Sequence, residues 1–139
     1  MTLSASEQTP MPPLAIIGLG CLFPGSVSAP AFWASVATGA DAIRPVPPSH
    51  WRPEDYWDGD PKAPDRTYAR RGGFLTPVDF PLLDFGIAPH TVEATDTSQL
   101  LGLLIARQAL VDAGYDADRQ FDRDRVSVIL GVTGTLELV

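Results

Sequence analysis

The sequence predicts an α/β fold of which it supplies only part of the sheet. Two short apolar runs, 14–20 (LAIIGLG) and 126–132 (VSVILGV), have the continuous hydrophobicity that is typical of buried parallel strands. Between them, 95–113 has the length and composition of a helix. Two strands and one nearly all-apolar helix cannot close a hydrophobic core. The prediction is therefore an incomplete sheet with a buried central helix.

A short helix is expected at 30–38, after a loop marked by Pro24 and Gly25 that follows the first strand. Pro30 suits the first turn of a helix, and Gly39 is a typical stop signal. The spacing predicts one inward-facing stripe made of Phe32, Trp33 and Val36.

The helix predicted at 95–113 has clear signals at both ends. Thr95 or Thr97 can cap its start, and Asp96 suits the positive N-terminal end of the helix dipole. Gly114 is the expected terminator.

The interior of this helix is apolar nearly all round from 100 to 106, which predicts a helix that is covered on most sides. Gly102 lies in this stretch. It indicates either the close approach of another backbone or a tolerated glycine that costs up to about 1 kcal/mol relative to alanine.

The segment 49–87 has no regular periodicity, but it carries too many large aromatic rings for a solvated linker. It is predicted to be an ordered surface excursion, with a short strand at 73–75. Arg66, Arg70 and Arg71 form the only basic cluster. They are interpreted as a solvated loop with local ion pairs or, alternatively, as a contact surface for an acidic carrier partner.

Composition excludes several classes of protein. The length of 139 residues suits one domain, and a net charge of −7 argues against nucleic-acid binding. A single cysteine excludes an intrachain disulfide framework and favours a reducing, cytoplasmic setting. No apolar run is long enough to cross a bilayer. Residues 1–13 are predicted to be a disordered leader rather than a signal peptide.

The glycine-rich stretch 18–25 (GLGCLFPG) invites comparison with a dinucleotide-binding loop. Such a loop needs a third glycine at position 23 and a helix that starts at once. Phe23 and Pro24 stand there instead. Nucleotide binding is kept only as a minor alternative, with Asp41 at about the right distance for a ribose contact.

No catalytic, metal-binding or cofactor-binding residue is predicted within this chain. Cys21 has apolar neighbours rather than the positive surroundings of a nucleophile, so it is predicted to be a buried structural thiol. His50 and His90 are predicted to be loop or surface residues. No spacing of His, Asp or Glu indicates a metal.

Three stretches together resemble the ketosynthase domains of modular polyketide and polyunsaturated fatty acid synthases, which have a thiolase-like fold. They are GLGCLFPG at 18–25, an ordered series of motifs within 49–87, and GVTGTLELV at 131–139. The series consists of His-Trp, a Tyr-Tyr-Asp-like cluster (Tyr-Trp-Asp here), Lys-Ala-Pro-Asp, Arg-Gly-Gly-Phe and Asp-Phe-x-x-x-x-Phe-Gly-Ile. Within 93–101 (EATDTSQLL), the departure from the commoner Met-Asp-Pro-Gln-Gln-Arg pattern favours the polyunsaturated fatty acid and glycolipid branch.

The resemblance implies that 14–139 is the N-terminal part of a ketosynthase domain, cut before the catalytic cysteine and both catalytic histidines. It also implies that Thr133 and Gly134 lie near the acyl pocket. The intact enzyme would condense an acyl thioester with a malonyl-carrier extender, as a homodimer without metal, using substrates carried on the phosphopantetheine of an acyl carrier protein. A non-catalytic docking piece and a small nucleotide-binding protein remain as the alternatives.

Overall fold

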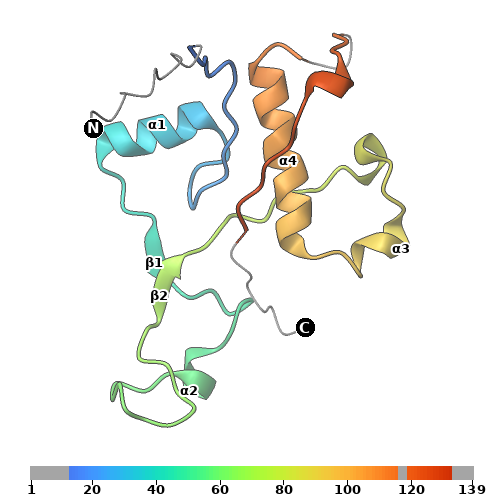
Figure 1. Cartoon of the computed structure of the whole chain (residues 1–139). Coiled ribbons are helices and arrows are strands. Elements are labelled where there is room, and N and C mark those ends of the chain that lie inside the picture. Colours follow the sequence, from blue (N-terminus) through green and yellow to red (C-terminus); the bar gives the residue numbers. More distant parts are fainter. Residues whose placement is uncertain (1–12, 116–118, 133–139) are drawn as a thin grey trace, which may run out of the picture.

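The computed structural model describes residues 13–115 and 119–132 (Figure 1). Four α-helices, two short strands and two 3-10 helices follow one another along the described chain. They are α1 (Ala29–Thr38), β1 (Ile43–Pro45), α2 (Pro53–Tyr56), β2 (Arg71–Gly73), η1 (Leu82–Phe85), α3 (Pro89–Val92), α4 (Thr97–Asp112) and η2 (Arg123–Arg125).

Helix α1 confirms the helix predicted at 30–38. Its start is capped by the Ser28 hydroxyl, which accepts a hydrogen bond from the Ala31 amide, and it ends at Gly39 with φ of 65°. The predicted inward stripe is only partly formed. Phe32 stacks on Phe23 with ring centroids 4.2 Å apart, whereas Trp33 is 71% exposed.

Helix α4 confirms the helix predicted at 95–113. Its two ends show which of the predicted capping and stop residues begin and end the helix. The capping side chain is Asp96, which accepts a hydrogen bond from the Ser98 amide, so the capping role predicted for Thr95 or Thr97 was wrong. Gly114 follows the helix with φ of 76°, in the left-handed conformation that glycine adopts without strain.

The sheet of the described residues is a two-stranded antiparallel ribbon that pairs Ile43 with Gly73. The strand predicted at 73–75 lies two residues nearer the N-terminus, as β2. Residues 46–70, which we call the lobe, close the ribbon at its far end and project away from the helices (Figure 1). Val46, where the lobe begins, is the only buried apolar side chain among the described residues.

The lobe is held together by contacts within itself. The Trp57 indole N–H donates to the Tyr68 carbonyl at 3.1 Å, and the Arg70 guanidinium lies over the Trp57 ring, 4.6 Å from its centroid. The backbone of Thr67 bonds to that of Tyr56 and Asp58. The ordered excursion expected from the aromatic rings is therefore present. The rings of the lobe pack locally, whereas Phe85, near the C-terminal end of the excursion, lies against Arg107 of α4.

The segments 14–20 and 126–132 do not form strands in the structure, so the prediction of two parallel strands was wrong for this chain on its own. A strand is defined by hydrogen bonds to a neighbouring strand, and neither segment has such a neighbour among the described residues. Their apolar sequence predicts burial, but it cannot supply the partner that makes a strand.

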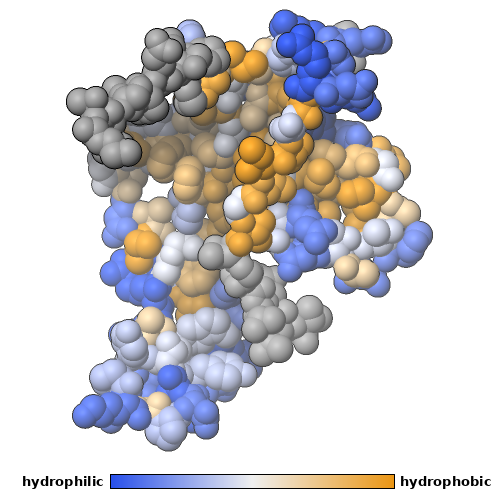
Figure 2. Space-filling model, in the orientation of Figure 1, coloured by the Kyte–Doolittle hydropathy of each residue, from blue (hydrophilic) through white to orange (hydrophobic). Residues whose placement is uncertain are grey.

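Large apolar side chains remain on the surface throughout the body that contains α1 and α4. No residue of α4 is buried, although the sequence predicts cover on most sides. Figure 2 shows apolar side chains gathered over this body, in contrast to the hydrophilic lobe below it. The helix is therefore present without the layer that should cover it.

Candidate functional surface

The segment 14–21 lies along α4, and two glycines allow it to approach the helix closely. A Cβ added to Gly18 would meet the Ala109 carbonyl oxygen and would lie 2.8 Å from the Ala113 Cβ. A Cβ added to Gly20 would lie 2.8 Å from the Ala109 amide nitrogen. Any side chain at either position would separate the two elements.

Two polar side chains of α4 fix this contact through hydrogen bonds. The Leu19 amide donates to Asp112 Oδ2 at 2.8 Å, and the Cys21 amide donates to Gln108 Oε1 at 3.1 Å. Gln108 also donates to the Val27 carbonyl at 3.1 Å. Because Gln108 and Asp112 are one helical turn apart, they bind alternate amides of the same extended segment.

This geometry argues against a nucleotide-binding loop at 18–25. A pyrophosphate would need free backbone amides and a helix N-terminus at this place. The amides of Leu19 and Cys21 are instead bound by side chains, one of which is the carboxylate of Asp112. α1 begins only at Ala29, after the turn at 23–26.

The predicted backbone approach at Gly102 is not found among the described residues, because a Cβ added there meets none of their atoms within 4 Å. The close approach lies at Gly18 and Gly20 instead. In the sequence Gly18 and Gly20 are typical of a loop, so they do not indicate a close contact, whereas a glycine inside a helix, such as Gly102, does.

The Gln108–Asp112 pair that binds the segment was not predicted from the sequence either. Its only signal is a pair of polar residues four apart in the C-terminal half of the helix.

Cys21 and the two histidines do not contact one another as a catalytic group would. Cys21 is partly exposed rather than buried as predicted. His50 packs edge-on against Phe74 with ring centroids 5.2 Å apart, and His90 lies in α3. Neither histidine forms a hydrogen bond with Cys21 within the described ranges, so these residues form no nucleophile–base pair.

The predicted pocket residues Thr133 and Gly134, and nearly all of the predicted leader at 1–13, lie outside the described residues. Within the described residues, no group of three or more His, Cys, Asp or Glu side chains could hold a metal ion. The same part of the chain has no helix long and apolar enough to cross a membrane.

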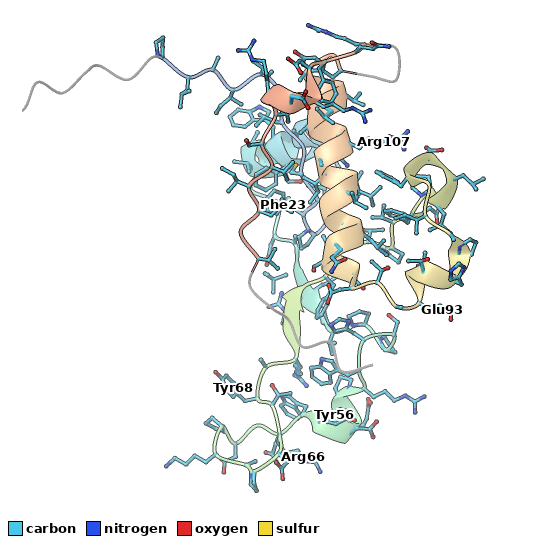
Figure 3. The ribbon with its side chains drawn as sticks, turned by 45° about the vertical axis from the view of Figure 1, so that its right-hand side comes forward. Phe23, Tyr56, Arg66, Tyr68, Glu93 and Arg107 are labelled. Atoms are coloured by element: carbon cyan, nitrogen blue, oxygen red, sulfur yellow. The ribbon has the colours of Figure 1, made fainter. Side chains whose placement is uncertain are left out.

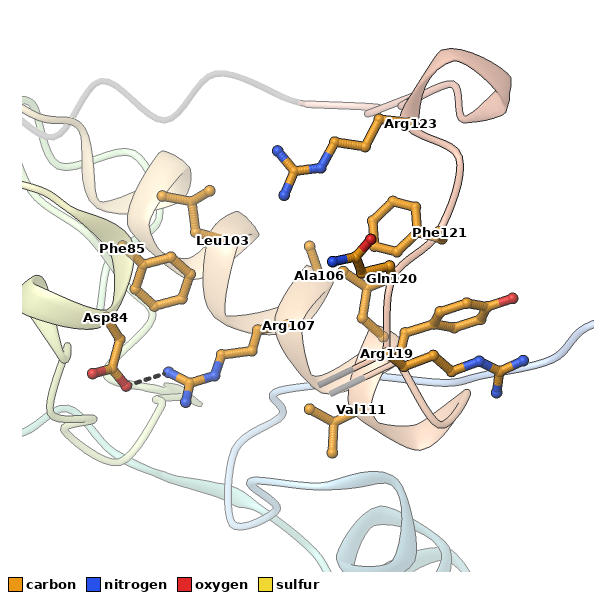
Figure 4. Close-up of a pocket in the computed structure, with 12 residues that line it drawn as sticks. Asp84, Phe85, Leu103, Ala106, Arg107, Val111, Arg119, Gln120, Phe121 and Arg123 are labelled. Atoms are coloured by element: carbon orange, nitrogen blue, oxygen red, sulfur yellow. Dashed lines mark hydrogen bonds and ion pairs between the residues drawn. The ribbon is translucent and has the colours of Figure 1, made fainter. Parts of the chain in front are cut away.

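A cavity of about 1260 Å³ lies between α4, η1 and 119–123 (Figure 4). Arg107 of α4 reaches across it to Asp84 of η1, with 2.7 Å between Nη1 and Oδ2. The Arg119 guanidinium lies 4.3 Å from the centroid of the Tyr115 ring. Arg107 is paired and Arg119 is stacked, whereas Arg123, which also lines the cavity, forms no ion pair among the described residues.

A smaller cavity of about 320 Å³ separates the two apolar segments where they run beside α4. Ile17 and Gly18 line one side, and Phe121 and Val126 line the other. Side-chain burial normally leaves few voids larger than a water molecule in a finished core. This opening therefore marks packing that the described residues do not complete.

The basic cluster of the lobe and ribbon makes local contacts. Arg66 donates to the Asp55 carbonyl, Arg70 stacks on Trp57, and Arg71 donates to the Ile43 carbonyl at 2.8 Å. Arg71 also lies 3.8 Å from Asp41 in an exposed ion pair. Figure 3 shows Tyr56, Arg66 and Tyr68 on the lobe, far along the molecule from Arg107 on α4.

The cap of α4 makes its N-terminus sensitive to acid. Hydrogen bonds from Ser98 hold the pKa of the Asp96 carboxyl below its ordinary value of 3.8. A group with a lowered folded-state pKa stabilises the fold above its unfolded pKa, and this contribution is lost as the pH falls through the folded value. Helix content measured by circular dichroism should therefore fall below about pH 4.

Asp96→Asn is the matched control for this acid effect, because asparagine caps a helix without titrating. The variant should lose the part of the acid transition that comes from α4. Identical acid profiles for the two proteins would show that the Asp96 carboxylate does not hold the start of the helix.

In the described residues a glycine-lined segment lies on the long helix α4, and a separate aromatic excursion lies between them in the sequence. The chain belongs to the β-ketoacyl synthase family. Residues 11–137 match the family model described as "Beta-ketoacyl synthase, N-terminal domain".

Several polyketide synthases are similar to this chain. A phenolphthiocerol/phthiocerol polyketide synthase of Mycobacterium tuberculosis is 38% identical over 123 residues, which is 87% of this chain and 7% of that protein. Pikromycin polyketide synthase component PikAII of Streptomyces venezuelae is 39% identical and matches 94% of this chain and 4% of that protein. The chain thus spans only a small fraction of the length of these relatives.

Among solved structures, the oxazolomycin ketosynthase domain OzmH KS7 of Streptomyces albus is similar, with a TM-score of 0.66 and 28% identity. The match covers 70% of this chain and 17% of that chain. It confirms the predicted fold class, the N-terminal portion of a thiolase-like α/β fold.

Proposed function

We propose that this chain is the scaffold-forming N-terminal part of a ketosynthase that acts in polyketide or long-chain fatty acid synthesis. The observation that carries the proposal is the family match over 11–137, together with the likeness to a solved ketosynthase domain. The reaction is the condensation of an acyl thioester with a malonyl-carrier extender. The setting is cytoplasmic, the enzyme is a homodimer, and its substrates arrive on the phosphopantetheine arm of an acyl carrier protein.

In this reaction a cysteine thiolate takes the acyl group, and the carrier thiol leaves. Decarboxylation of the malonyl thioester then yields a carbanion, which attacks the acyl-enzyme and releases the thiolate. Two histidines assist decarboxylation and stabilise the developing negative charge. Cys21, His50 and His90 do not take these roles, because they share no interaction and match none of the family's catalytic motifs. The catalytic trio comes from the remainder of the domain, and 14–132 positions it.

A hybrid protein tests the function. Residues 11–137 of this chain replace the matching segment of the PikAII protein, which supplies the rest of its domain. The hybrid is expected to release CO₂ from a malonyl-carrier thioester and to form the condensed product, whereas the 139-residue chain alone forms none. A hybrid that folds with a cooperative melt but forms no product would contradict the proposed function.

Cys21→Ala in the same hybrid is expected to keep nearly all of the condensing activity, because Cys21 is held through its backbone amide and acts as a small apolar side chain. The matched control replaces the cysteine that the PikAII part supplies, and it should lower the rate by several orders of magnitude. A comparable loss from Cys21→Ala would make Cys21 a participant in the reaction.

A further inference from the structure

We propose that the apolar face of this chain binds the C-terminal remainder of a ketosynthase domain when that remainder is supplied as a separate polypeptide. The face, which we call the completion face, is formed by 14–19, α4 and 126–132. Two chains would then assemble one domain without a covalent link. The proposal rests on the proposed function, since it takes the partner from the same family.

The completion face exposes apolar side chains on both of its extended segments, 14–19 and 126–132. Leu14 is 90% exposed and Ile129 is 93% exposed, and the other large apolar side chains of the two segments are all more than half exposed. In 126–132 the side chains of adjacent positions, Val128 and Ile129, are both exposed, so neither side of the segment is covered. A segment that is apolar on both sides requires a layer on each side.

The backbone of the face is unpaired as well. Within the described ranges, 127–132 forms no hydrogen bond between backbone groups. In 14–21, the amides of Leu19 and Cys21 are bound by Asp112 and Gln108. Amides of neighbouring residues point to opposite edges of an extended segment, so the edge that carries the amides of Gly18 and Gly20 remains for a partner. The partner must therefore offer strand backbone as well as apolar side chains.

The exposed area decides how large the partner must be. The chain has a mass of 14.9 kDa and exposes 12417 Å². A folded protein of this mass exposes about 7000 Å², which leaves an excess of about 5400 Å². Counting every residue outside the described ranges as fully solvated still leaves an excess of about 2800 Å².

This excess is larger than ordinary docking covers. A standard interface removes about 800 Å² from each partner, and large permanent interfaces remove about 1000–2500 Å² from each. A carrier domain bound through a standard interface would leave much of the completion face in water, and a second copy would have to form an interface at or beyond the upper end of the permanent range. The area instead matches the completion of a domain core. The solved ketosynthase domain has the required size, because the match takes up only 17% of its chain.

The test is co-expression of the 139-residue chain with the part of the PikAII ketosynthase domain that follows the matching segment. We expect the two chains to copurify at a ratio of one to one, with the mass of the pair measured by light scattering. Binding of a hydrophobic dye by the pair should fall severalfold relative to the chain alone.

Two variants at exposed positions locate the contact. Ile129→Asp places a charge on the completion face and should abolish copurification. Tyr68→Asp places the same charge on the self-contained lobe, where the side chain is 67% exposed, and should leave copurification unchanged. Equal effects of the two variants would overturn the assignment of the face.

The covalent hybrid of the previous subsection serves as a control. It tests whether this chain and the rest of the PikAII ketosynthase domain can pack together when they are linked. A hybrid that folds while the separate chains do not associate would overturn the proposal, as would a hybrid that does not fold. A monodisperse homodimer of this chain without dye binding would also overturn it, because the occupant would then be a second copy. Association without condensation contradicts only the proposed function.

Discussion

Replacing Gly18 by valine is expected to detach the segment 14–21 from α4 and to destabilise the hybrid ketosynthase domain by about 3 kcal/mol. The added side chain would meet the Ala109 carbonyl oxygen and the Ala113 Cβ, neither of which can rotate away. Loss of the contact also breaks the hydrogen bond from the Leu19 amide to Asp112. The measurement is denaturant unfolding, combined with hydrogen exchange of the Leu19 and Cys21 amides.

Gly59→Val is the matched control for this prediction. The same Cβ at Gly59 would meet only the Trp57 ring, at 3.8 Å, which is an ordinary contact. This variant should keep the unfolding midpoint and the exchange protection of the hybrid. If Gly18→Val is as stable as Gly59→Val, the close approach of the segment to α4 is not part of the finished domain.

The helices could be predicted from the sequence because their signals are local. The start of α1 depends on Ser28 and Pro30, and the end of α4 depends on Gly114, all within a few residues of the helices. The error at the start of α4 is also local. Three adjacent residues can cap a helix, and only the backbone conformation of Asp96 selects it over Thr95 and Thr97.

The strands and the glycine contact could not be predicted in this way because they depend on distant residues. Leu19 and Asp112 are 93 positions apart, and no local pattern joins an amide in a loop to a carboxylate on a helix. The apolar runs at 14–20 and 126–132 predict burial, but their side chains are exposed among the described residues. Whether they become strands depends on neighbours that the described residues do not provide.

The isolated 139-residue chain is expected not to behave as a monodisperse, cooperatively folded monomer. Its most exposed apolar side chains, such as Leu14, Ile16 and Ile129, are 84–93% exposed. Each forfeits roughly 1.5–3 kcal/mol by remaining in water. Several such side chains together forfeit as much as the whole stability of a domain, about 5–15 kcal/mol.

The lobe cannot offset this loss, because its contacts join its own residues or the adjoining ribbon, and it buries little beyond Val46. The chain should therefore aggregate or form a loose state that binds hydrophobic dyes, with helical circular dichroism but no sharp melt. Ile129→Asp should reduce the dye binding and aggregation of the isolated chain, whereas Tyr68→Asp should not. A single monomeric peak in size-exclusion chromatography with a sharp thermal transition would contradict this expectation. It would mean that the apolar segments find cover within the chain itself, and the completion face would then have no free surface to offer a partner.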